Sequence, residues 1–194
     1  SEAETRKLYI DLLLHEAGWT VTEQVGKIVP RQAGIEIEVQ GMPNESGMGY
    51  ADYVLFDADG TPLAVVEAKR TNVDAVAGRH QAELYADCLA ARYVCPRPVI
   101  YYTNGFETNI IDGIGYPSRK VMGFHTIDEL RRMIAQRGRT DITDLQISDR
   151  ITNRNYQKRM IESVCKHYNS KHRRALLVMA TGTGKTRVSI SLVD

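Results

Sequence analysis

Two carboxylates and a lysine occur on neighbouring strand-like segments, in a spacing that suits hydrolysis of a phosphodiester. Residues 50–56, which include Asp52, and residues 62–69, which include Glu67 and Lys69, are predicted strands separated by a short turn. Antiparallel pairing of these segments would bring Asp52 and Glu67 to one edge of a sheet. Lys69 follows Glu67 by two residues, so the two side chains are expected on the same face.

These three side chains predict a metal-assisted nuclease site. Carboxylates hold hard divalent cations such as Mg²⁺. A cation of this kind polarises a phosphate and lowers the pKa of a bound water. The lysine can stabilise the charge that develops in the transition state. On spacing alone, the alternative is an ordinary hairpin with charged ends, because short motifs occur by chance.

A glycine-rich loop near residue 182 predicts a nucleotide-binding site. The apolar run 175–179 predicts a buried parallel strand, and residues 187–192 are expected to continue as a helix. Strand, loop and helix are the setting of a P-loop, in which Lys185 reaches the β- and γ-phosphates. Met179 stands where the general pattern has glycine, and the alternative is a turn with a chance Lys-Thr pair. The residues expected to line the site are Thr181, Gly182, Thr183, Gly184, Lys185 and Thr186, the last on Mg²⁺.

The segment 154–157, taken with this loop, resembles the start of a superfamily 2 helicase ATPase. The resemblance implies that Gln157 reads the adenine edge of ATP. Helicases of that superfamily also tolerate a residue other than glycine at the first loop position, which accounts for Met179.

The order of these motifs along the chain resembles the restriction (R) subunit of type I restriction-modification enzymes. Further matching segments are the N-terminal residues 2–19, the Gln-x-x-x-Tyr spacing of Gln81 and Tyr85, and the turn 103–105. The resemblance implies a cytoplasmic PD-(D/E)xK endonuclease that cleaves foreign double-stranded DNA and is fused to an ATP-driven translocase. It also implies modification and specificity subunits as partners. We expect an N-terminal fragment, because the chain stops soon after the first motor motif.

Three residues near the predicted nuclease site allow two interpretations. Gln81 and Tyr85 are four residues apart and share a helical face, so both can point toward the site or the DNA. Without the resemblance, Tyr85 is a tyrosine at the edge of the core and Gln81 an ordinary helical residue. Glu4 is either a capping-box partner of Ser1 or, as the resemblance allows, an additional carboxylate near the metal.

The predicted fold is α/β, with a mixed sheet flanked by helices in a restriction-endonuclease-like core, followed by the beginning of a RecA-like domain. The expected domains are residues 1–140 (endonuclease), 141–154 (linker) and 155–194 (motor). The sequence predicts an initial helix over residues 1–17, whose apolar stripe is made of Leu8, Leu12 and His15 with Tyr9 and Leu13. It also predicts a half-buried strand over 35–39, in which the apolar residues at 35, 37 and 39 share one face. The other predicted elements are the hairpin over 50–69, a helix over 74–93, a hairpin around Asn104-Gly105, and a helix over 126–135 with a Thr126/Glu129 capping box.

The composition is that of a globular protein, with 43% hydrophobic and 25% charged residues and no apolar run of membrane-spanning length. The three cysteines show no metal-site spacing. Residues 1–149 hold 15 Lys/Arg and 22 Asp/Glu, whereas residues 150–174 hold eight Lys/Arg and one glutamate. This basic stretch is either a solvated helix face or a track for a phosphate backbone. Two other functions remain open: a non-catalytic DNA-docking module, and a DNA-repair helicase-nuclease.

Overall fold

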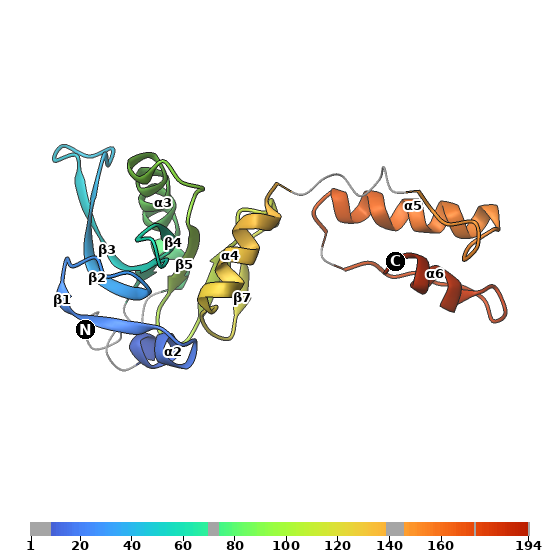
Figure 1. Ribbon diagram of the computed structural model, residues 1–194, viewed down its shortest axis with the longest axis horizontal. Coiled ribbons are helices and arrows are strands. Elements are labelled where there is room, and N and C mark those ends of the chain that lie inside the picture. The colour runs from blue at the N-terminus through green and yellow to red at the C-terminus, as the bar shows by residue number, and fades with distance from the viewer. Residues whose placement is uncertain (1–8, 70–73, 139–145, 173, 194) are drawn as a thin grey trace. The chain divides into compact units, whose positions relative to one another are not determined.

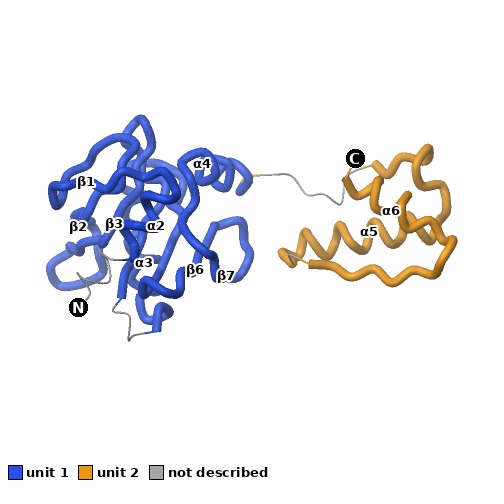
Figure 2. The backbone as a smooth tube through the Cα atoms, turned by 90° about the horizontal axis from the view of Figure 1, so that it is seen from below, with its two compact units in different colours: residues 1–137 blue, residues 138–194 orange. Residues whose placement is uncertain are grey.

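The computed structural model describes residues 9–69, 74–138, 146–172 and 174–193. The chain divides into two compact units, residues 1–137 and residues 138–194 (Figure 2). Each unit is described by itself.

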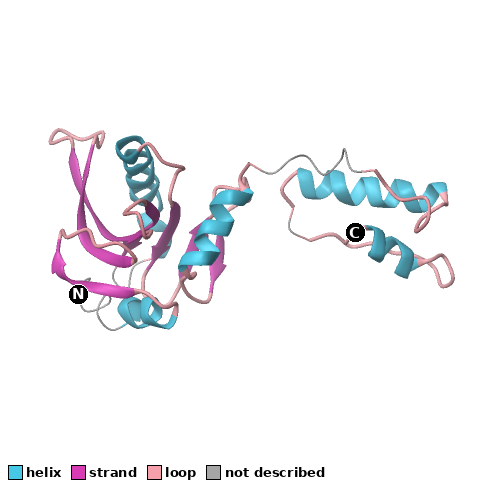
Figure 3. Ribbon diagram, in the orientation of Figure 1, coloured by secondary structure: helices cyan, strands magenta, loops and turns pink. Residues whose placement is uncertain are grey.

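The first unit is built on one mixed sheet of seven strands, which follow one another across the sheet in chain order (Figures 1 and 3). The β1–β2 and β4–β5 pairs are parallel, and the other neighbouring pairs are antiparallel. The predicted mixed sheet is therefore confirmed. The strands are β1 (Thr20–Val25), β2 (Gln32–Gln40), β3 (Met48–Phe56), β4 (Pro62–Ala68), β5 (Val99–Thr103), β6 (Thr108–Ile111) and β7 (Arg119–Val121).

Helices cover both faces of this sheet. On one face lies α3 (Arg79–Tyr93), which the short helix η2 (Ala75–Gly78) precedes and which connects the parallel strands β4 and β5. On the other face, α2 (Asp11–Glu16) and α4 (Ile127–Gln136) bury Leu14 and Leu130 against the strands. Because β4 is covered on both sides, all seven of its residues are buried. This central strand carries Glu67.

Local sequence signals fixed several boundaries as expected. Thr126 and Glu129 form the predicted capping box at the start of α4. Asp74 accepts a hydrogen bond from the Val76 amide and so begins η2. At Asn104 the chain turns from β5 into β6, and the side-chain oxygen of Asn104 accepts hydrogen bonds from two amides within the turn.

Two expectations about apolar faces were wrong in whole or in part. Leu13 of the expected stripe packs against the core, but Leu12 is 57% exposed and the buried residues near α2 are Ile10 and Leu14. In β2, Ile35 packs on the α2/α4 face but Ile37 packs on the α3 face. The intervening Glu36 has a φ of 48°, which reverses the alternation of side chains. Residues 1–8, and with them the proposed Ser1/Glu4 cap, lie outside the described part.

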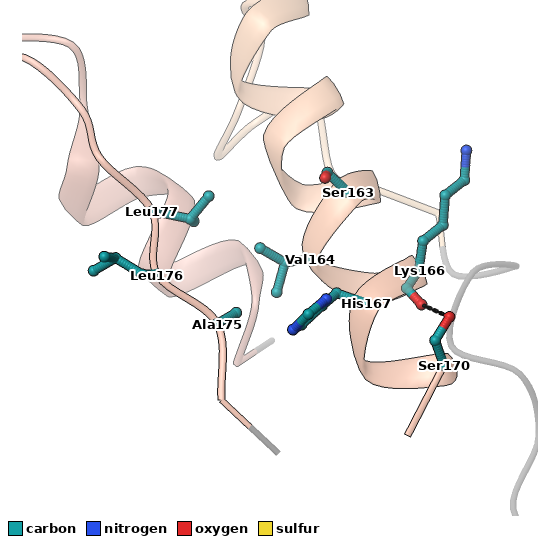
Figure 4. A pocket seen from close by; sticks show the side chains of 8 residues that line it. All are labelled: Ser163, Val164, Lys166, His167, Ser170, Ala175, Leu176 and Leu177. Carbon is teal, nitrogen blue, oxygen red and sulfur yellow. Dashed lines mark hydrogen bonds between the residues drawn. The ribbon is translucent and has the colours of Figure 1, made fainter. Parts of the chain in front are cut away.

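The second unit contains two helices, α5 (Asn155–Asn169) and α6 (Lys185–Ser191). The buried strand predicted over 175–179 was wrong, because residues 174–180 form no strand. Leu176 and Leu177 both help line a pocket of about 340 Å³. The Leu177 side chain points toward Val164 of α5, whereas that of Leu176 points the other way and is 89% exposed (Figure 4). A buried parallel strand requires strands on both sides, and residues 146–172 and 174–193 contain none.

Among the helices in the described ranges, none combines the length and the apolar character needed to cross a bilayer.

Candidate active site

Asp52 lies where the β3–β4 ladder ends. The last pair at this end of the ladder is Tyr53 and Val66, and Asp52 and Glu67 are their immediate neighbours in β3 and β4. Two residues further along β4, the Ala68 amide donates a hydrogen bond to Asp52 Oδ2 at 2.7 Å. The aspartate side chain thus takes the place of a backbone acceptor, and its carboxylate is held beside the residue that follows Glu67.

Glu67 and Lys69 form an ion pair at the same edge of the sheet. Glu67 is 3% exposed, and Lys69 Nζ lies 2.8 Å from its Oε1. The Lys69 amide also donates to the Thr103 carbonyl at 2.8 Å, which continues the β4–β5 pairing past the end of β4. A buried carboxylate is costly without a compensating positive charge, and the lysine supplies one.

Helix α3 places Gln81 and Tyr85 against this pair. Gln81 Oε1 accepts from Lys69 Nζ at 3.2 Å, and Gln81 Nε2 donates to the Tyr85 hydroxyl at 2.7 Å. The side chains of Glu67, Lys69, Gln81 and Tyr85 therefore form one continuous hydrogen-bonded chain. The Tyr85 ring packs in the core under α3, so only its hydroxyl takes part.

The surroundings of Tyr85 keep its hydroxyl neutral. Burial raises the pKa of Tyr85, and the negative charges of Glu67 and Asp52 raise it further, while the hydrogen bond from Gln81 acts in the opposite direction. At neutral pH the phenol therefore keeps its proton and remains available as a donor.

Two glycines that the sequence did not single out make room for this arrangement. A Cβ added at Gly78, at the end of η2, would lie 2.9 Å from Glu67 Cγ and 3.5 Å from Lys69 Cε. A Cβ added at Gly49, in β3, would lie 2.7 Å from the Tyr85 ring. Their sequence neighbours carry no motif, so only the close approach of η2 and α3 to the sheet reveals their role.

The donor set fits a hard divalent cation of the Mg²⁺ type. Asp52 and Glu67 offer carboxylate oxygens, and Mg²⁺ is commonly held by one or two carboxylates while it keeps several waters. Within the ranges that the structure describes, no group of three or more His, Cys, Asp or Glu side chains converges to hold a metal. Asp52 and Glu67 are the two carboxylates at this edge that could hold such an ion, and Glu4 lies outside the described ranges.

In the second unit, the predicted nucleotide loop and Gln157 lie together. Gly182 and Gly184 adopt positive φ values of 78° and 85°, and α6 begins at Lys185. Gln157 Nε2 donates to the Thr183 carbonyl at 2.9 Å, and the Tyr156 hydroxyl donates to the same oxygen at 2.7 Å.

Gln157 is almost fully buried, at 2% exposure, and its amide contacts the loop backbone. A Cβ on Gly184 would meet Gln157 Nε2 at 2.4 Å, so glycine is required for this contact. Gln157, the residue expected to bind the adenine edge, thus links α5 to the loop by a hydrogen bond in this structure.

Family models match two parts of the chain. Residues 26–106 match the second domain of the type I restriction enzyme EcoKI endonuclease subunit. Residues 150–194 match the res subunit of type III restriction enzymes. The first match contains Asp52, Glu67, Lys69, Gln81 and Tyr85, and the second contains the glycine-rich loop.

Whole-chain comparisons agree with these matches. The EcoKI endonuclease subunit of Escherichia coli K12 is 29% identical over 100% of this chain and 21% of its own length. The EcoAI endonuclease subunit of Escherichia coli is 28% identical over 91% of this chain and 23% of its own length. A solved fragment assigned to the HsdR subunit of a type I restriction enzyme from Vibrio vulnificus shares 29% identity and a TM-score of 0.52, over 99% of this chain and 37% of that one.

The mixed sheet with its carboxylate–lysine edge and these matches define the class as a restriction-enzyme subunit. More narrowly, the matched relatives, the family model and the solved fragment indicate the endonuclease subunit of type I restriction enzymes. The chain spans about a fifth of the length of the curated relatives it matches.

Proposed function

We propose that the first unit is a metal-dependent DNA endonuclease domain, and that the second unit begins an ATP-driven DNA-translocating motor. The observation that carries the proposal is the convergence of Asp52, Glu67, Lys69 and Gln81 at one sheet edge, with Tyr85 behind them. An ordinary hairpin with charged ends requires neither a buried glutamate nor the hydrogen-bonded chain to α3.

Each side chain has a distinct part in phosphodiester hydrolysis. Asp52 and Glu67 would hold a Mg²⁺ ion, which when bound would supply Lewis acidity at the phosphate and lower the pKa of a coordinated water. Lys69 donates a hydrogen bond to the phosphate oxygens or to the attacking water and so stabilises the developing negative charge. The water oxygen forms the new bond to phosphorus while the bond to the leaving oxygen breaks.

Gln81 and Tyr85 act on this reaction through Lys69. Gln81 accepts from Nζ and thereby limits where the ammonium can point. Tyr85 accepts from the Gln81 amide and fixes which way that amide is turned. Both are positioning residues in this proposal, and the close contact of Gly78 with Glu67 serves the same end.

The motor half of the proposal depends on the loop at Lys185. Lys185 neutralises phosphate charge and Thr186 offers a hydroxyl to Mg²⁺, as in other P-loop proteins. The family also leads us to propose double-stranded DNA as substrate, and modification and specificity subunits as partners. Supporting observations are the two family matches and the contact of Gln157 and Tyr156 with the loop.

Nicking of supercoiled plasmid DNA by the chain of residues 1–194 tests the nuclease assignment. We expect nicking in Mg²⁺, no nicking in EDTA, and a loss of at least about 100-fold in Lys69→Ala, because a removed transition-state donor costs roughly 10²–10³ in rate. Tyr85→Phe keeps the ring in the core and should lose a smaller factor. Equal nicking by Lys69→Ala and the wild-type chain, both folded, would refute the assignment.

A further inference from the structure

Two aromatic rings lie on the surface at the end of the sheet that carries the proposed nuclease site. Phe106, in the turn between β5 and β6, is 67% exposed, and Tyr9, just before α2, is 37% exposed. Their ring centroids are 4.7 Å apart, with an angle of 48° between the planes. Tyr9 thus packs against the Phe106 ring, and most of the Phe106 surface is exposed among the described residues.

The turn that presents Phe106 is held by its own hydrogen bonds. Asn104 Oδ1 accepts from the amides of Phe106 and Glu107 at 3.2 and 2.8 Å. The Gly105 amide donates to Thr103 Oγ1 at 3.0 Å. A turn with these bonds keeps the ring in one place, so a partner that binds the ring does not have to order it first.

This turn is joined directly to the proposed site. The Thr103 carbonyl accepts from the Lys69 amide at 2.8 Å. Phe106 follows Thr103 by three residues, so their Cα atoms are at most about 11 Å apart. Phosphates succeed one another every ~3.4 Å along the axis of a DNA strand, so a strand bound at Lys69 passes the turn within a few nucleotides.

The charge of the turn does not oppose such a strand. Glu107, beside Phe106, is paired with Lys120 of β7, whose Nζ lies 2.6 Å from the carboxylate. An ion pair that is already neutral adds little repulsion toward phosphates, and the lysine remains largely exposed.

We propose that Phe106, supported by Tyr9, stacks on an unpaired or unstacked nucleobase of the DNA strand next to the scissile phosphate. The proposal rests on the proposed nuclease function for its choice of partner. Bases offer flat π faces, and stacking on an aromatic side chain tolerates any sequence. An aromatic contact of this kind would open the duplex locally and leave the choice of sequence to other parts of an enzyme.

Binding of the chain of residues 1–194 to a gapped duplex, followed by fluorescence anisotropy in Ca²⁺, tests this contact. A stacking residue replaced by alanine typically costs 1–3 kcal/mol per base, so Phe106→Ala should weaken binding by roughly 5- to 150-fold. Phe106→Leu, which is apolar but not aromatic, should recover only part of the loss. Met122→Ala is the matched control, because Met122 is 99% exposed in the same unit and no contact is proposed for it.

An abasic scan of the gapped strand identifies the stacked base. At one nucleotide, removal of the base should weaken DNA binding by the wild-type chain but not weaken DNA binding by Phe106→Ala any further. This result is expected when the residue and the base act as a pair. Unchanged DNA affinity in folded Phe106→Ala would overturn the proposal and point to a protein partner for the ring. Full recovery of affinity in Phe106→Leu, or absence of DNA binding by the wild-type chain, would also overturn the proposal. Plasmid nicking separates the failure of this proposal from that of the nuclease proposal. If the wild-type chain nicks plasmid DNA and Phe106→Ala binds DNA as tightly as the wild type, only the stacking contact is overturned.

Discussion

The Asp52 carboxylate accepts a hydrogen bond from the Ala68 amide at 2.7 Å, at the point where the β3–β4 ladder ends. The same side chain thus completes the backbone bonding of β4 and stands beside Glu67. The hydrogen bond to Ala68 is a structural role of this carboxylate, and a substitution can separate it from the proposed role in holding a cation.

Asp52→Asn should abolish cleavage but leave the fold nearly unchanged. The asparagine carbonyl can still accept from Ala68, whereas the negative charge that holds a cation is lost. Asp52→Ala should abolish cleavage and also lower the free energy of unfolding by about 1–3 kcal/mol, because a partly buried amide loses its acceptor. Urea unfolding and plasmid nicking of both variants measure the two effects. Substantial nicking by Asp52→Asn would exclude Asp52 as a metal ligand.

Gly78→Ala should damage the site although Gly78 carries no functional group. Its φ of −84° is accessible to alanine, so the effect comes from the new Cβ, which would lie 2.9 Å from Glu67 Cγ. Displacement of a reacting group by about 1 Å can cost 10²-fold in rate, and we expect a loss of about 10- to 100-fold in nicking. Gly123→Ala is the control, since a Cβ there meets no atom within 4 Å. If both variants nick at the wild-type rate, the packing of η2 does not position Glu67.

The contact between Asp57 and Arg131 should make the first unit more stable at neutral than at acid pH. The hydrogen bond from Arg131 holds the pKa of Asp57 below the usual value of 3.8. The stabilisation is therefore complete above pH ~4 and is lost as pH falls through the lowered pKa. Asp57→Asn should lower the Tm at pH 7 and approach the wild-type Tm near pH 3.

Asp128→Asn removes the other carboxylate that contacts Arg131 and serves as the comparison. Asp128 is 75% exposed in its side chain, so its loss should change the Tm much less than the loss of Asp57. A difference between wild type and Asp57→Asn that stays constant from pH 7 to pH 3 would show that the charge of Asp57 is not responsible.

The chain of residues 1–194 should show no ATP hydrolysis above that of its Lys185→Ala variant. In the proposed nucleotide site Lys185 and Thr186 would provide only some of the contacts, because P-loop enzymes also use an aspartate to hold Mg²⁺. Between residues 150 and 193 the sequence offers a single carboxylate, Glu162 on α5. Phosphate release measured side by side for the two chains tests this, and turnover that depends on Lys185 would mean that these residues suffice.

The sequence predicted those parts of the structure that local rules govern. The Thr126/Glu129 capping box, the Asn104 turn and the β3–β4 hairpin each depend on a few adjacent residues. The reversal at Glu36 could not be foreseen, because a positive φ is uncommon in a residue other than glycine and the sequence around Glu36 gives no signal for one.

Elements that depend on distant partners were the ones missed. Strand β1 is mostly exposed and β7 has three residues, so neither shows a clear hydrophobic pattern. Residues 175–179 have the composition of a buried strand but no strand to pair with among the described residues of their unit. The role of Gly78 likewise appears only when η2 is packed against β4.

Metal binding by the first unit tests the central claim most directly. Mn²⁺ is a spectroscopic substitute for Mg²⁺, and its binding to the chain of residues 1–194 can be followed by electron paramagnetic resonance without any cleavage. We expect one site in the wild-type chain, and a loss of affinity of at least tenfold in Glu67→Gln, which keeps the size of the side chain and removes its charge. Thermal unfolding of the variant establishes that it is folded. Equal Mn²⁺ affinity in folded Glu67→Gln and wild type would contradict the account.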